Sequence, residues 1–225
     1  MAADQINAIF FDLDNTLCDV EGSFAERYQA GISALIQQDS RWTEEELLQR
    51  TISMDRSRGR LSALLVELGV NDSEAGRAAL EAENEVLFSK LKLFPQILES
   101  LDVLSEYYVL GIITNGLAAQ QTRKLRTLQL ERFFPIIIID EKLGTSKPNA
   151  EIFEVAIAKA GCKPNQAMYV GDQWDVDVRG ANLAGLHAVW INHDGLEQPK
   201  FGHAKFVLHS VAELPEALGL STPEM

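Results

Sequence analysis

Residues 8–17 read AIFFDLDNTL, and this stretch decides how the rest of the chain is interpreted. Its first four residues form a short apolar run of the kind that makes a strand buried on both faces of a sheet. Two carboxylates follow, at Asp12 and Asp14. In extended backbone, residues two apart point to the same side, so both carboxylates face one spot. Such a pair either caps amides in a turn, titrates abnormally or holds a hard cation such as Mg²⁺.

Five further apolar runs have the same character, and they alternate with segments whose apolar residues recur at helical spacing. We predict strands at Ala8–Phe11, Tyr108–Ile113, Ile136–Ile139, Ala167–Val170, His187–Ile191 and Lys205–Leu208. This alternation predicts an α/β fold with a doubly wound, Rossmann-like parallel sheet covered by helices.

One connection is too long for an ordinary crossover between parallel strands. It runs from about residue 19 to residue 93 and shows no strand pattern. Instead it contains four helical stretches, at residues 22–38, 44–55, 60–68 and 74–91. We therefore expect an all-helical cap domain of residues 19–93 inserted into a catalytic core of residues 1–18 and 94–225. The expected place of the cap is over the edge of the sheet where open α/β folds bind ligands.

The composition limits the classes of partner. The 225 residues carry 20 Lys and Arg against 33 Asp and Glu, a formal net charge of −13. Nucleic acid polymers and anionic membranes bind clustered cations, so we predict neither as a partner. Two isolated cysteines, Cys18 and Cys162, form no disulfide framework, and no signal-peptide or membrane-spanning pattern is present. We expect a cytoplasmic protein that is a monomer or a homodimer.

Polar residues follow three other predicted strands. The tripeptide TNG at 114–116 offers a hydroxyl and loop amides to an oxyanion, although by itself it is also an ordinary turn. Lys147 follows in the segment GTSKPN, where a lone lysine is otherwise a solvated surface charge. The segment GDQWDVD brings Asp172 and Asp177 directly after the fourth strand. The sequence thus supplies candidate site residues at several strand ends.

In this order the segments resemble the four motifs of the haloacid dehalogenase superfamily. The resemblance covers essentially the whole chain, and it is to the phosphatases whose helical cap is inserted after the first strand. Asn15 stands where many relatives carry glycine, a variant of the nucleotidase-like and phosphoglycolate-phosphatase-like branches. The resemblance implies a Mg²⁺-dependent phosphomonoester hydrolase that works through an aspartyl-phosphate.

The resemblance also implies roles for the first and fourth motifs. Asp12 would be the nucleophile, and Asp14 would be the general acid and base. The Mg²⁺ ion would be held by Asp12, by the backbone carbonyl of Asp14 and by Asp172.

The other two motifs would handle the phosphoryl group. Thr114, the amide of Asn115 and Lys147 would bind its oxygens and stabilise the transferring charge. Asp177 would support Lys147 or the water shell of the metal.

The expected substrate is a small phosphorylated metabolite, either a nucleoside monophosphate or a sugar or organic-acid phosphate. In this family the cap contacts the leaving group, and the segment DRSRGR at 55–60 is the candidate for that contact. Its arginines, Arg56, Arg58 and Arg60, either bind an anionic substrate or form an ordinary solubilising turn between helices.

Four alternatives remain open. A phosphomutase shares every core motif and differs in how its cap returns the intermediate. A 2-haloacid dehalogenase lacks an acid at the position of Asp14 and needs no metal. A phospho-accepting receiver combines acids, Thr and Lys at strand ends but is shorter and lacks the insertion. A non-catalytic member of the family that only binds a ligand would not need all four motifs intact, as they are here.

Overall fold

The computed structural model describes residues 5–54 and 59–220. The chain divides into two compact units, one of Met1–Asp19 with Leu93–Met225 and one of Val20–Lys92. Two short strands, β2 (Cys18–Asp19) and β3 (Lys92–Leu93), pair with each other where the chain leaves and re-enters the first unit.

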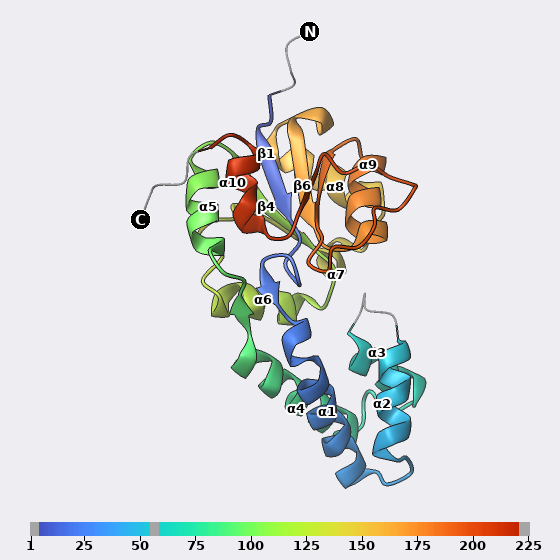
Figure 1. Ribbon diagram of the computed structural model, residues 1–225. Coiled ribbons are helices and arrows are strands. Elements are labelled where there is room, and N and C mark those ends of the chain that lie inside the picture. The colour runs from blue at the N-terminus through green and yellow to red at the C-terminus, as the bar shows by residue number, and fades with distance from the viewer. Residues whose placement is uncertain (1–4, 55–58, 221–225) are drawn as a thin grey trace. The chain divides into compact units, whose positions relative to one another are not determined.

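The first unit is built on a six-stranded sheet in the order β5-β4-β1-β6-β7-β8, and all of its strand pairs are parallel (Figure 1). The strands are β1 (Ala8–Phe11), β4 (Val109–Thr114), β5 (Ile136–Ile139), β6 (Ala167–Gly171), β7 (His187–Ile191) and β8 (Phe206–Leu208). Every predicted strand forms, and each end lies within one residue of its predicted position. The predicted α/β fold class is confirmed.

Helices cover both faces of this sheet (Figure 1). On one face, α8 packs on β1, β4 and β5, and α9 packs on β7; on the other, α5 packs on β4 and α10 packs on α5. The helices of this unit are α5 (Ile97–Ser105), α6 (Ala118–Thr127), α7 (Asp140–Leu143), α8 (Ala150–Ala160), α9 (Arg179–Leu183) and α10 (Leu214–Ala217). The short segment Trp174–Val178 precedes α9 as a turn of π-helix.

Strand β1 is buried on both faces, as its apolar sequence predicts. Ala8 and Phe10 pack in the core beneath α8, whereas Phe11 points to the opposite face and meets the ring of Phe134 edge to face at 6.0 Å. Because β1 lies between β4 and β6, the residue after it stands between the carboxyl ends of those two strands. That residue is Asp12.

The second unit is helical. It consists of α1 (Phe24–Gln38), α2 (Glu44–Ser53), α3 (Arg60–Glu67) and α4 (Glu74–Lys90), which lie within the four predicted helical stretches. Thr43 and Ser73 cap the N-termini of α2 and α4, because each side-chain oxygen accepts a hydrogen bond from the backbone amide three residues later. Its core is made of Tyr28, Ile32, Leu35, Leu47, Leu61, Leu64 and Leu65, among others. Each unit thus has its own apolar core.

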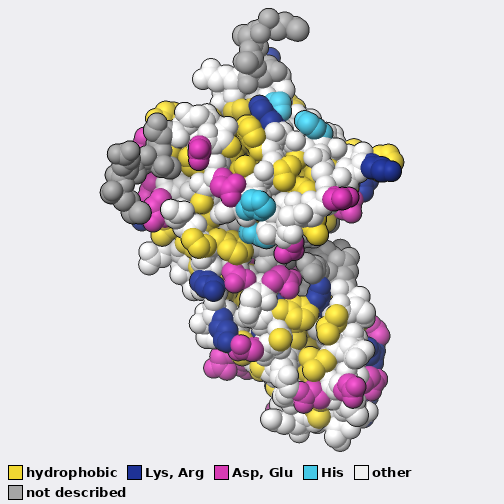
Figure 2. Space-filling view, in the orientation of Figure 1, with side chains coloured by type: hydrophobic (Ala, Val, Ile, Leu, Met, Phe, Trp, Pro, Cys, Tyr) yellow, Lys and Arg dark blue, Asp and Glu magenta, His cyan; other side chains and the backbone are white. Residues whose placement is uncertain are grey.

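The surface bears on the predicted partners. On the face seen in Figure 2, acidic and basic side chains are scattered over both units and are not gathered into one basic area. Within residues 5–54 and 59–220, every helix is too short or too polar to cross a lipid bilayer.

Candidate active site

The loop after β1 presents the first two acids. The amide of Asp12 donates to the carbonyl of Val170 in β6 at 2.9 Å, and the Asp12 side chain is buried. The chain then turns sharply at Asn15, whose φ of 57° lies in the left-handed region that glycine and asparagine adopt most readily. This backbone requirement explains in physical terms why asparagine can replace glycine there.

Lys147 joins the nucleophile candidate to the fourth motif. Its ammonium lies 2.8 Å from Oδ1 of Asp12, 2.8 Å from Oδ1 of Asp177 and 2.7 Å from the hydroxyl of Tyr169. An ammonium has three N–H donors, and here three buried protein groups accept them. Phosphate binding by Lys147 therefore requires one of these bonds to be exchanged for a phosphoryl oxygen.

The charges around Lys147 shift one another's pKa values. Burial raises the pKa of Asp12 from 3.8 to about 6, although the Lys147 ammonium opposes that rise. Burial also disfavours the charged form of Lys147, but Asp12 and Asp177 outweigh it and hold the pKa of Lys147 above its usual value. The ionised form of Asp12 is therefore stabilised by Lys147, and the ionised form of Lys147 by Asp12 and Asp177.

Asp177 is positioned by its own short helix and by a glycine. Its Oδ2 accepts the amide of Gln173 at 2.9 Å, and the side chain is fully buried. A Cβ at Gly171, the last residue of β6, would lie 2.4–2.6 Å from three side-chain atoms of Asp177, two of them in its carboxyl group. Only glycine leaves room for the carboxylate at this strand end.

Three carboxylates form a candidate cation site. Oxygen atoms of Asp12, Asp172 and Asp177 lie within 4.8 Å of one another. Burial, followed by the charges of Asp177 and Asp12, holds the pKa of Asp172 well above its usual range. One ammonium, that of Lys147, does not balance three acids, and the donor set contains oxygen only. The residues present therefore fit a hard divalent cation such as Mg²⁺.

The tripeptide 114–116 lies at the end of β4, where Thr114 is the last residue of the strand, one beyond its predicted end, and Asn115 and Gly116 follow it. Asn115 clamps the backbone of Lys147, and the amide of Gly116, one of the predicted oxyanion-binding amides, instead donates to Oδ1 of Asp140 at 2.7 Å. Gly116 has a φ of 139°, which is open to glycine and strained for other residues. Thr114 is buried at the end of its strand. Thr114 and Asn115 thus lie at the carboxyl end of β4, beside the end of β1 that leads into Asp12.

Two residues of α6 reach this site that the sequence did not indicate, Gln121 and Lys124. Lys124 Nζ lies 2.8 and 2.6 Å from the two carboxylate oxygens of Asp14, and Gln121 Nε2 donates to Thr114 Oγ1 at 2.7 Å. Both side chains are buried. The available signal was their spacing of three residues, which places two polar side chains on the same helix face as the buried Leu125.

The sequence predicts substrate contacts for three arginines of the cap, Arg56, Arg58 and Arg60. Arg56 and Arg58 lie outside the described residues. Arg60 is buried in the helical unit, and its guanidinium stacks over the ring of Phe24 with 4.7 Å to the ring centroid. A role for these arginines in substrate binding stays a prediction.

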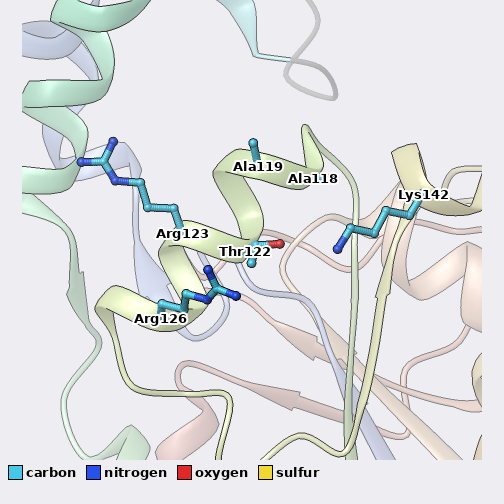
Figure 3. Close-up of a pocket in the computed structure, with 6 residues that line it drawn as sticks. All are labelled: Ala118, Ala119, Thr122, Arg123, Arg126 and Lys142. Carbon is cyan, nitrogen blue, oxygen red and sulfur yellow. The ribbon is translucent and has the colours of Figure 1, made fainter.

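A separate pocket of about 410 Å³ lies on the outer side of α6 (Figure 3). Its lining comes from α6 and from Lys142 of α7, whose side chain extends toward α6. The lining residues are Ala118, Ala119, Thr122, Arg123, Arg126 and Lys142. None of the acids described above lines it, so this pocket is distinct from the candidate active site.

Comparison with known proteins agrees with this geometry. Residues 9–191 match the family model described as haloacid dehalogenase-like hydrolase. The chain belongs to this family. It is 35% identical over 195 residues to a glyceraldehyde 3-phosphate phosphatase of Methanopyrus kandleri, covering 83% of this chain and 84% of that protein. The predicted family and its hydrolase class are confirmed.

Two further comparisons extend over nearly the whole chain. A pyrimidine 5'-nucleotidase of Escherichia coli is 29% identical over 93% of this chain and 96% of its own. The crystal structure of a phosphatase of the same family from Thermococcus onnurineus superposes with a TM-score of 0.76 at 26% identity, covering 96% of this chain and all of that one. The similarity to this structure therefore extends over both units of the chain.

Proposed function

We propose that this protein is a Mg²⁺-dependent phosphatase that hydrolyses phosphomonoesters of small metabolites through an aspartyl-phosphate on Asp12. Two of the relatives compared above are named for small phosphorylated substrates, one as a glyceraldehyde 3-phosphate phosphatase and one as a pyrimidine 5'-nucleotidase, which supports this substrate class. The proposal does not choose between a nucleoside monophosphate and a sugar or organic-acid phosphate.

One observation carries the proposal. A buried carboxylate, Asp12, stands at the carboxyl end of the central strand, 2.8 Å from the ammonium of Lys147, which is itself held by Asp177. Neither a turn nor an ordinary surface ion pair accounts for burying this many charges together, since burial of ions is costly. A site that must neutralise and transfer a phosphoryl dianion does account for it.

The two half-reactions use Asp12 and Asp14. An Oδ of Asp12 attacks phosphorus, the ester P–O bond breaks, and the leaving oxygen takes a proton from the carboxyl group of Asp14. Water then attacks the phosphorus of the aspartyl-phosphate and gives a proton to Asp14. The P–O bond to Asp12 breaks, which releases inorganic phosphate and restores the Asp12 carboxylate. Thr114, Asn115 and Lys147 bind the phosphoryl oxygens throughout.

The metal requirement follows from the acidic cluster. Asp12 and Asp172, with the backbone carbonyl of Asp14, would hold Mg²⁺, and Asp177 is close enough to contribute to the same cluster. A bound Mg²⁺ supplies the positive charge that lets a carboxylate approach a phosphate dianion.

The test is phosphate release from a panel of phosphorylated metabolites, with Mg²⁺ and with EDTA. We expect metal-dependent release from one chemical class, and we expect Asp12→Asn to abolish it. Asp175→Asn is the matched control, because Asp175 lies in the same motif but is exposed and paired with Arg179. Substantial hydrolysis by Asp12→Asn would remove the proposed nucleophile.

Product analysis separates a phosphatase from a phosphomutase. Release of one inorganic phosphate per substrate consumed supports hydrolysis, whereas an isomerised phosphate ester with no free phosphate contradicts it. A cytoplasmic location and a monomeric or homodimeric state remain predictions from the sequence.

A further inference from the structure

The inner face of α6 is polar where a helix packed in a core is normally apolar. Gln121, Lys124 and Leu125 are its buried residues, and only the last is hydrophobic. Arg123 and Arg126 of the same helix are exposed on the outer side, where they line the pocket of Figure 3. The helix therefore directs one specific lysine inward while its other cationic residues face outward.

The inward lysine has a single anionic partner among its described contacts. The Lys124 side chain is 3% exposed, and its ammonium contacts both carboxylate oxygens of Asp14, at 2.8 and 2.6 Å. The Asp14 side chain is 28% exposed, so the carboxylate keeps one open side. A buried ammonium without its carboxylate is strongly unfavourable, which fixes the direction in which the Asp14 side chain points.

Gln121 connects Asp14 to the phosphoryl-binding loop. Its Nε2 donates to Thr114 Oγ1 at 2.7 Å and also lies 3.3 Å from Asp14 Oδ2 and 3.1 Å from the carbonyl of Asn115. Its Oε1 is buried and has no hydrogen-bond partner within the described part of the chain. The three acceptors around Nε2 therefore determine how the amide is oriented. Thr114 Oγ1 accepts from Gln121, and its own proton is donated in a long hydrogen bond of 3.4 Å to the carbonyl of Asn115, which a phosphoryl oxygen would have to replace.

We propose that Lys124 and Gln121 are positioning residues for the proposed phosphatase reaction. Lys124 holds the carboxyl group that exchanges protons with the leaving group and with water. Gln121 ties that group to Thr114 and sets the direction of the Thr114 hydroxyl toward a phosphoryl oxygen. Both act through other side chains, since each is buried. This inference rests on the proposed function.

The test for Lys124 compares two leaving groups. An alkyl phosphate needs a proton on its leaving oxygen, whereas p-nitrophenyl phosphate leaves as a stable anion and needs little help. We expect Lys124→Met to lower kcat/KM for the alkyl ester on the order of 10²-fold, and for the aryl ester by much less. Arg126→Met, an exposed substitution on the same helix, should change neither value. A parallel loss on both esters would mean that Lys124 only stabilises the fold.

A double-mutant cycle tests whether Lys124 acts through Asp14. In an Asp14→Asn background, Lys124→Met should have no further effect on kcat/KM for the alkyl ester, and the double variant should melt at a higher temperature than Asp14→Asn alone. A full additional loss in that background would show that Lys124 acts elsewhere and would overturn the inference.

Gln121 should affect a different measurement, because it contacts Thr114 and Asn115, which are proposed to bind the phosphoryl group. Gln121→Met should weaken inhibition by inorganic phosphate several-fold, whereas Lys124→Met should leave that inhibition unchanged. If the unaltered protein releases no phosphate from either ester, the proposed function fails and this inference fails with it. If it is active and the two variants behave alike, only the inference fails.

Discussion

The side chain of Asn115 is hydrogen-bonded to both polar groups of the Lys147 backbone: its Nδ2 donates to the carbonyl at 3.1 Å, and its Oδ1 accepts from the amide at 3.0 Å. The two residues lie 32 positions apart: Asn115 follows β4, and Lys147 lies in the loop between α7 and α8. This reciprocal pair fixes where the Lys147 side chain starts, and so where its ammonium meets Asp12. Asn115 thus has a structural task in addition to the phosphate contact predicted for its backbone amide.

Asn115→Ala removes both bonds and should misplace the ammonium of Lys147. We expect kcat/KM to fall on the order of 10²-fold, because small displacements of a positioned group are costly. The free energy of unfolding should fall by about 1–2 kcal/mol. Phosphate release and urea denaturation measure the two effects. The matched control is Asn149→Ala, which removes the cap of α8 and should cost about 1 kcal/mol of stability without changing kcat/KM. Equal losses of activity in the two variants would contradict the clamp.

Metal binding should be visible without turnover. If the acidic cluster binds Mg²⁺, the ion stabilises the folded state, by about 2.7 kcal/mol at a hundred times its Kd. We expect the melting temperature to rise with added MgCl₂, and Asp172→Asn to lose most of that rise. Asp175→Asn should retain it, because Asp175 is exposed and outside the cluster. An identical rise in all three proteins would place the bound ion elsewhere.

The sheet was predictable because its strands are short runs of apolar residues with turn signals between them. Ala8–Phe11 and Ile136–Ile139 have the predicted bounds, since buried parallel strands have little choice of residue type. The placement of the candidate site residues was predictable for a related reason: Asp12 and Asp172 directly follow buried strands and Thr114 ends one, so their positions depend on the chain order of the sheet.

Helix faces were less predictable. A helix such as α6, with a single buried apolar residue, looks solvent-exposed. The spacing of three residues places Gln121 and Lys124 on one face, but it does not show that this face points inward. Their burial is decided by tertiary partners, Asp14 and Thr114, that are distant in sequence. Similarly, Tyr169 is indistinguishable from a core residue until its hydroxyl is seen to accept from Lys147.

Loss of the central ammonium should destabilise the protein in a pH-dependent way. Lys147→Met leaves the buried carboxylates of Asp12 and Asp177 without compensation, which should cost about 3–5 kcal/mol near pH 8 without metal. Burial already raises the pKa of Asp12 to about 6, and removing Lys147 raises it further.

The sign of this pH dependence follows from proton linkage. Between the ordinary aspartate pKa near 4 and the raised pKa of the folded variant, Asp12 carries a proton in the folded state but not in the unfolded chain. Lowering the pH through this range therefore stabilises the folded variant. The deficit should therefore shrink as pH falls from 8 toward 5. Urea denaturation in EDTA at both pH values measures it, with Lys142→Met, an exposed lysine, as control. A deficit that is unchanged across this range would argue against buried, uncompensated carboxylates.

Gly171→Ala tests the packing that holds Asp177. The new Cβ would lie 2.4–2.6 Å from three side-chain atoms of Asp177, so that side chain must shift, which disturbs its contact with Lys147. Overpacking of this kind costs about 1–3 kcal/mol, and we expect phosphatase activity and the Mg²⁺-dependent rise in melting temperature to fall with it. Gly161→Ala is the control, because Gly161 caps α8 with open space around it and a φ of 66°. That change should cost about 1 kcal/mol from backbone strain alone and leave activity intact. Full activity in Gly171→Ala would mean that the position of Asp177 does not matter to the reaction.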